Sequence, residues 1–158
     1  MNNNDILRRL RHALDLKNSD LMKIIGNTGT DPTPSQISSW LKRGDDPGYV
    51  GLPDSVLCRF LDGLIIEERG KRADGSIPEP LEELSNNEIL RKLRIALELH
   101  DDGMNTVFAN AKFEVTKAEL GSFFRKKGHR HYRECPEQVL RKFIAGLGRN
   151  PRKKSHGK

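Results

Sequence analysis

Residues 3–16 read NNDILRRLRHALDL, and residues 86–99 read NNEILRKLRIALEL. The two copies lie 83 residues apart, and the same offset relates further positions of the chain without a gap. These pairs include Trp40 and Phe123, Tyr49 and Tyr132, Pro53 and Pro136, Phe60 and Phe143, and Gly63 and Gly146. A match at one fixed offset over about sixty positions is an internal repeat. We therefore predict two homologous modules, residues 1–69 and 86–148.

Helical spacing of apolar residues predicts an all-α fold with four helices in each module. The first helix of each copy carries this pattern at Ile6, Leu7, Leu10, Ala13 and Leu14, and at Ile89, Leu90, Leu93, Ala96 and Leu97. The asparagine run before each helix supplies N-cap side chains. Second helices are expected at residues 20–27 and 104–110. The polar run 101–105 predicts that the second helix of the second copy is short.

The third helix of each copy begins with a capping box, Thr33 to Gln36 and Thr116 to Glu119. Trp40 and its counterpart are expected at one core position of this helix. The proline pair at 53 and 136 is predicted to open the fourth helix, which is apolar on one face.

The remaining segments connect and end the modules. Residues 70–85 contain Gly, Pro and acidic residues, which predicts a linker. Residues 149–158, RNPRKKSHGK, predict a disordered basic tail. A module of about 65 residues buries only a modest core. The two copies are therefore expected to pack on each other, or each to be a tight helical unit.

The net charge of +6 is unevenly distributed along the chain. Residues 1–64 hold eight basic and eight acidic residues, and residues 86–148 hold twelve and eight. The last ten residues hold five basic residues and no acidic one. This asymmetry indicates an anionic partner for the second module and the tail.

The cysteines and the distribution of apolar residues indicate the cellular compartment of the protein. The two cysteines, Cys58 and Cys135, stand at non-equivalent positions, which argues against a disulfide framework and for a reducing compartment. The N-terminus lacks an apolar signal segment, and no stretch is apolar enough to predict a membrane span. We expect a cytoplasmic protein without a membrane contact.

The doubled NN(D/E)ILR(R/K)LR phrase, DDPGY at 45–49 and GHRHYREC at 128–135 resemble the YehS-type proteins, a family of small bacterial tandem-repeat proteins. The resemblance covers all of the chain except the tail. It implies a two-module helical fold and a cytoplasmic setting, and it implies no activity, because the family has none assigned.

A second resemblance is looser. Gly29 followed by Ile37-Ser38-Ser39-Trp40 is similar to repressor-type helix-turn-helix domains, although the turn is longer than theirs by about two residues. The modules are therefore expected to be loosely helix-turn-helix-like.

The strongest candidate site is the basic loop, residues 125–133. Its possible nucleic-acid contacts are Arg125, Lys126, Lys127, His129, Arg130, His131, Tyr132 and Arg133. Cations hold phosphates, and an aromatic ring can stack on a base. The first copy carries Asp45 and Asp46 in the corresponding segment, so this function is expected of module two alone. A solvated charged surface remains the alternative for the cations, and packing against the fourth helix remains the alternative for the ring.

Arg91 and Arg94 add two further candidates on the first helix of module two. They stand three residues apart on one helical face, as Arg8 and Arg11 do in module one, and could hold phosphates. The alternative is pairing with a carboxylate four residues on, which is Glu98 for Arg94.

Metal binding, cofactors and catalysis are not predicted. The spacing of His129, His131 and Cys135 fits no common zinc pattern, and cations surround it. Cys135 stands beside basic residues, a setting that lowers a thiol pKa. No nucleophile with a base, and no phosphate-cradling glycine loop, is evident.

The sequence thus favours a non-catalytic nucleic-acid-binding protein, with RNA slightly preferred over DNA. The alternative is a protein-interaction adaptor, in which a partly exposed Trp40 or Phe123 anchors a protein partner. The oligomeric state is not predicted.

Overall fold

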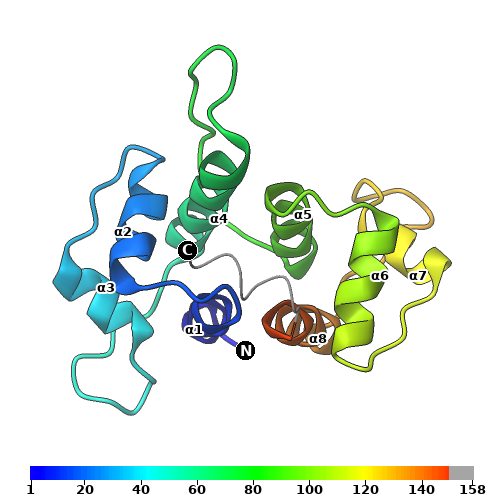
Figure 1. The fold of residues 1–158 in the computed structure, drawn as a ribbon, viewed down its shortest axis with the longest axis horizontal. Helices are drawn as coiled ribbons and strands as arrows, with labels where there is room; N and C mark the ends of the chain where they lie inside the picture. Colours follow the sequence, from blue (N-terminus) through cyan, green and yellow to red (C-terminus); the bar gives the residue numbers. More distant parts are fainter. Residues whose placement is uncertain (150–158) are drawn as a thin grey trace.

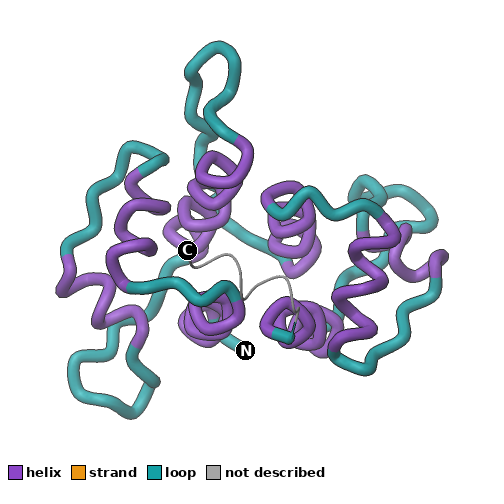
Figure 2. Tube along the Cα trace, in the orientation of Figure 1, coloured by secondary structure: helices purple, strands orange, loops and turns teal. Residues whose placement is uncertain are grey.

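The computed structural model describes residues 1–149, and within this part of the chain it contains eight helices and no strand. Figures 1 and 2 show their arrangement. In chain order the helices are α1 (Asn3–Ala13), α2 (Asn18–Gly26), α3 (Pro34–Leu41), α4 (Asp54–Arg69), α5 (Asn86–Ala96), α6 (Asp101–Asn110), α7 (Lys117–Phe123) and α8 (Glu137–Gly148). The all-α, two-module prediction is confirmed. The predicted tail falls on 149–158 and, beyond Arg149, lies outside the described residues.

The helix starts follow the local signals in the sequence. The side chains of Thr33 and Thr116 accept hydrogen bonds from the backbone three residues on, and both capping boxes are complete. The same role falls to Asn2 before α1 and to Ser85 before α5, so an asparagine caps only the first copy. Pro53 and its counterpart take the N-cap position directly before α4 and α8.

The prediction of a short second helix in module two was wrong. Helix α6 begins at Asp101, three residues before the expected start, and is one residue longer than α2. The two aspartates at 101 and 102 account for this start, because carboxylates in the first turn are stabilised by the positive end of the helix dipole.

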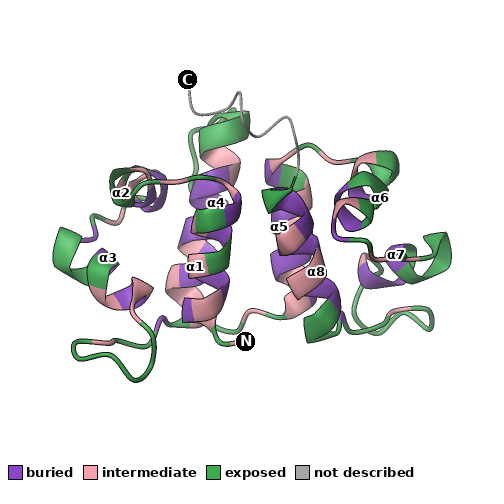
Figure 3. Cartoon of the chain, turned by 60° about the horizontal axis from the view of Figure 1, so that its bottom comes forward, coloured by how far each residue is buried: buried purple, intermediate pink, exposed green. Residues whose placement is uncertain are grey.

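The two modules pack as one body around a single hydrophobic core. Helices α1, α4, α5 and α8 lie side by side in the centre, while α2 and α3 flank one side and α6 and α7 the other (Figure 3). Across the boundary α1 packs on α8 and α4 packs on α5, which are equivalent contacts under the repeat. The expectation that the copies pack on each other is confirmed.

Equivalent residues occupy equivalent core positions. Trp40 is 8% exposed and Phe123 is 4% exposed, so both residues are buried as predicted. Gly63 and Gly146 mark the crossings of α4 over α2 and of α8 over α6. A Cβ at either position would lie 1.9 Å from a backbone oxygen, that of Ile24 or of Val107. Only glycine therefore permits these two crossings.

The segment between the modules runs back along α4. The amide of Leu81 donates to the thiol of Cys58, and the amide of Leu84 donates to the carboxylate of Asp54 at 2.8 Å. Residues 70–85 thus return the chain from the end of α4 to its beginning, where α5 starts beside it.

Candidate nucleic-acid interface

The basic loop connects α7 to α8 and is held by one buried side chain. The side-chain nitrogen Nδ2 of Asn87 donates to the backbone carbonyls of Phe123 at 3.0 Å and Arg133 at 2.8 Å. Its oxygen accepts from the amide of Cys135 at 2.8 Å. Asn87 is 4% exposed, so it clamps the loop from inside the module at both ends.

Module one repeats this clamp with Asn4. Its amide nitrogen donates to the carbonyls of Trp40 and Val50, each at 2.9 Å, and its oxygen accepts from the amide of Leu52 at 3.0 Å. Sequence reasoning missed both asparagines as loop clamps and assigned the asparagine run to capping. The available signal was the recurrence of the second asparagine of each NN pair, a polar residue at a buried helical position.

Within the loop, local hydrogen bonds shape the turn and leave the cations outside. Lys126 and His129 accept backbone bonds from residues three further on, and Gly128 adopts a positive φ of 97°. The side chains of all five loop cations are exposed. Among residues 1–149, none of the five lies within ion-pair distance of a carboxylate. Arg130 and His131 contact each other at 3.2 Å.

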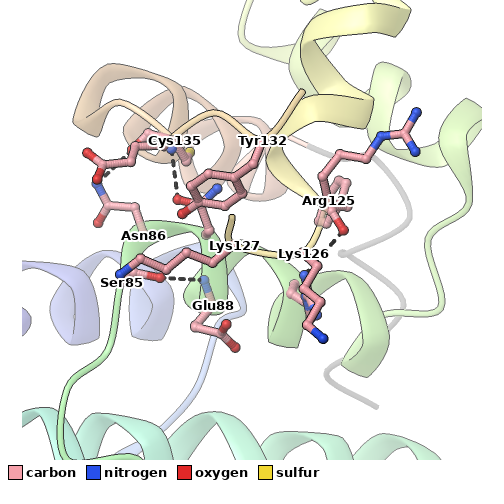
Figure 4. Close-up of a pocket in the computed structure, with 12 residues that line it drawn as sticks. Ser85, Asn86, Glu88, Arg125, Lys126, Lys127, Tyr132 and Cys135 are labelled. Atoms are coloured by element: carbon pink, nitrogen blue, oxygen red, sulfur yellow. Dashed lines mark hydrogen bonds between the residues drawn. The ribbon is translucent and has the colours of Figure 1, made fainter. Parts of the chain in front are cut away.

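A cleft of about 760 Å³ lies between this loop and the start of α5. Four basic residues line it, Arg91, Arg125, Lys126 and Lys127, together with two acidic residues, Glu88 and Glu134. Figure 4 shows Tyr132 and Lys127 above the beginning of α5, near Ser85 and Glu88. The cleft therefore combines cations with a half-buried aromatic ring.

Tyr132 differs from its counterpart in module one. The hydroxyl of Tyr49 donates to Asn4 at 3.0 Å, which ties that ring to α1. The hydroxyl of Tyr132 has no hydrogen-bond partner within residues 1–149. The module-two tyrosine is thus available to a ligand, whereas the module-one tyrosine is part of the loop clamp.

The structure separates the two predicted arginines of α5. Arg91 donates to the carbonyl of Phe124 at 3.3 Å and lines the cleft. Arg94 donates to Leu99 and to the carboxylate of Asp101 at 3.2 Å, and its guanidinium stacks 4.5 Å from the Phe124 ring centre. Arg94 is therefore engaged in holding α5 against α6 and α7.

The alternative considered for Arg94, pairing with Glu98, does not form; Arg94 pairs with Asp101 instead. Helix α5 ends at Ala96, and Glu98 has a φ of 52°, so it no longer continues the helical face. Its carboxylate lies 3.2 Å from Arg69 instead. In module one Arg11 likewise bonds to Asn18.

Residues His129, His131 and Cys135 do not converge. The two histidines are exposed on the loop, with ring centres 5.5 Å apart, whereas Cys135 is buried beside the start of α8. Within residues 1–149 no group of three metal-ligating side chains is present. Burial raises the pKa of the Cys135 thiol to about 12, which corrects the expectation of a lowered value.

No helix of the described chain, residues 1–149, has the length and apolar character needed to cross a membrane. Within residues 1–149 the chain is thus a two-module helical protein with a basic, tyrosine-lined cleft in its second module. The chain belongs to the family described as "Protein of unknown function (DUF1456)", which matches it twice, at residues 3–70 and 86–153. It is 40% identical over 147 residues to "Uncharacterized protein YehS" of Escherichia coli (strain K12), covering 93% of this chain and 94% of that protein. No solved structure matches it.

Proposed function

We propose that this chain is a non-catalytic nucleic-acid-binding protein that holds a single strand, preferably RNA, in the cleft of module two. One observation carries the proposal: within residues 1–149, the clamped basic loop presents cations without a carboxylate partner beside a tyrosine whose hydroxyl has no hydrogen-bond partner. Cations at the cleft rim would contact phosphates, and Tyr132 would stack on a base.

Helix α7 supports a single strand over duplex DNA as the ligand. It has only seven residues, and its exposed positions include Lys117, Glu119 and Gly121, which is a sparse set for reading base edges in a major groove. Six residues separate it from α6, and seven separate α3 from α2, so neither turn is the tight turn of a helix-turn-helix.

The burial of two aromatic residues weighs against the alternative function, a protein-interaction adaptor. It required Trp40 or Phe123 to be partly exposed, and both are buried in the core. We propose a cytoplasmic setting, in agreement with two cysteines that are free thiols.

Equilibrium binding to fluorescent oligomers of equal length tests the proposal. Wild type should bind single-stranded RNA at low salt, single-stranded DNA more weakly and duplex DNA most weakly. Tyr132→Ala should lose about 1–3 kcal/mol of binding free energy if the ring stacks on a base. The matched control is Tyr49→Ala, which changes the equivalent residue of module one and should leave RNA binding unchanged. Failure of the wild type to bind any oligomer at low salt would refute the proposal.

A further inference from the structure

A second basic groove lies between α1 and α8, where module one packs on module two. Its volume is about 600 Å³. The basic residues that line it are Arg8, Arg9, His12, Arg43 and Arg149. Ala145 and Gly148 of α8 form part of its wall, so small side chains leave the space open on that side.

The positive charge of the groove is only partly balanced. Arg8 is paired with Asp5 and donates to the carbonyl of Lys42 at 2.8 Å. Arg9, Arg43 and Arg149 have no carboxylate within ion-pair distance in the described chain, residues 1–149.

The nearest acidic group of α8 is already engaged. Glu137 pairs with the N-terminal amine of Met1 and lies 2.6 Å from Arg141. The N-terminal amine, followed by Arg141 and Arg9, holds the pKa of the Glu137 carboxyl below its usual range. Glu137 therefore stays ionised but does not bind Arg9 directly.

The modules meet along two equivalent boundaries, which we call seams: α1 with α8, and α4 with α5. The α4–α5 seam shows which partner Arg9 lacks. Between α4 and α5, Lys92 donates to the carboxylate of Asp62 at 2.6 Å, and both side chains are largely buried. The repeat relates Lys92 to Arg9 and Asp62 to Ala145. One seam therefore carries an internal ion pair, whereas the other carries the cation and lacks the acid.

We propose that the groove between α1 and α8 binds a phosphate-bearing anion, which takes the place of the missing carboxylate beside Arg9. Guanidinium groups suit this ligand, because their planar donors match phosphate oxygens in pairs. The phosphate comes from a free polyphosphate or from a nucleic-acid backbone. This inference is independent of the cleft in module two, which uses other residues.

The direct test is a calorimetric titration of the full chain with inorganic tripolyphosphate at low salt. Ala145→Asp recreates the arrangement of Asp62 and Lys92, so it should supply the missing carboxylate to Arg9. It should raise the Kd by roughly tenfold or more. Ala145→Asn is the matched control, because it has the same size without the charge, so the rise in Kd of Ala145→Asp beyond that of Ala145→Asn measures the effect of the carboxylate.

A second pair of variants keeps the test independent of any folding defect at position 145. Arg9→Gln with Arg43→Gln should also raise the Kd by roughly tenfold or more. Lys71→Gln with Arg72→Gln removes the same charge from exposed positions of the segment between the modules, residues 70–85, and should leave the Kd unchanged. Circular dichroism confirms that each variant retains its helices.

Binding that is equal in Ala145→Asp and Ala145→Asn, with no effect of the Arg9 and Arg43 variant, would overturn the inference. So would the absence of any tripolyphosphate binding. If only the variant Lys126→Gln/Lys127→Gln/Arg130→Gln loses tripolyphosphate binding, the anion binds at the basic loop. That result would overturn the inference of an anion site in the groove and would leave the proposed function intact. Conversely, if Ala145→Asp weakens tripolyphosphate binding but the wild type binds no oligomer, the anion site in the groove is supported and the proposed function is refuted.

A parallel titration with single-stranded RNA distinguishes the two sources of the phosphate. Weaker RNA binding by Ala145→Asp identifies a nucleic-acid backbone, and unchanged RNA binding identifies a free polyphosphate.

Discussion

The loops at residues 42–50 and 125–133 are held by the same hydrogen bonds but display different chemistry. A buried asparagine of the first helix clamps each loop, and a backbone bond from Val50 to Ser39 has its counterpart from Arg133 to Ser122. In module one, charged side chains form hydrogen bonds within the loop: Lys42 donates to the carbonyl of Pro47, and the carboxylate of Asp46 accepts from the backbone amide of Arg43. In module two, within residues 1–149, the five loop cations have no carboxylate partner and the Tyr132 hydroxyl has no hydrogen-bond partner.

This comparison separates what the repeat keeps from what it changes. The clamp, the glycine crossings and the capping boxes of the third helices are the same in both copies, because each specifies the backbone path. The exposed side chains differ, because exposed polar substitutions change stability little. The predictions below test first the shared frame and then the differences, from the largest expected effect to the smallest.

The glycine crossings should be the most sensitive shared feature. Gly63→Ala and Gly146→Ala each place a methyl group against a backbone oxygen, so α4 or α8 must move away from its partner helix. We expect each to lower the free energy of unfolding by roughly 3 kcal/mol or more in urea denaturation, because the clash is with the backbone. Gly121→Ala is the control, since its methyl meets nothing within 4 Å. A large loss at only one crossing would show that the modules are not equivalent.

The second prediction concerns the two seams between the modules. Asp62→Ala leaves Lys92, whose side chain is 17% exposed, without its partner. We expect a loss of about 3 kcal/mol, at the lower end for a broken buried pair because Lys92 retains some solvent contact. Adding Lys92→Met should recover most of this loss by removing the unpaired charge. If the single variant is as stable as the double variant, the ion pair does not distinguish the seams.

The third prediction tests the asparagine clamps. Asn4→Ala and Asn87→Ala each leave buried backbone groups of a loop without hydrogen-bond partners. Each should cost about 2 kcal/mol of unfolding free energy. Amide hydrogen exchange should accelerate at Cys135 in the Asn87 variant and at Leu52 in the Asn4 variant. Unchanged exchange at these amides would argue against the clamp.

The smallest effect should separate the two tyrosines. Tyr49→Phe removes the hydrogen bond to Asn4 and should cost about 1 kcal/mol of unfolding free energy. Tyr132→Phe removes a hydroxyl without a partner in the described chain, residues 1–149, and should leave stability unchanged within about 0.5 kcal/mol. Equal losses would mean that the module-two tyrosine is as firmly held as its counterpart.

Local signals in the sequence were enough to predict the fold class and most helices. The capping boxes at Thr33 and Thr116 involve residues three apart, so the sequence contains the whole interaction. The seam between α4 and α5 could not be predicted, because Lys92 and Asp62 are 30 residues apart and helical periodicity shows burial without naming the partner. The start of α6 was missed because apolar spacing was weighed above the aspartates of its first turn.

The candidate site was predicted in part. Charge counting identified the cations of the basic loop, and the repeat showed that module one lacks them. The recurrence of Asn87 at a buried helical position indicates that this side chain has hydrogen-bond partners, but it does not identify the carbonyls 36 and 46 residues away as those partners. Nor could charge counting separate Arg91, which lines the cleft, from Arg94, which stacks on Phe124.

The most direct test of the account is a salt titration of RNA binding. The three proteins to compare are wild type, Lys126→Gln/Lys127→Gln/Arg130→Gln in the basic loop, and the charge-matched control Lys17→Gln/Lys71→Gln/Arg72→Gln, whose positions are exposed outside module two. Each phosphate contact contributes a slope of roughly −0.7 to log K against log salt for a single strand. We predict that the loop variant binds more weakly and flattens the slope by about 2, whereas the control retains the wild-type slope. Identical affinity and slope for all three proteins would contradict the claim that the basic loop of module two binds nucleic acid.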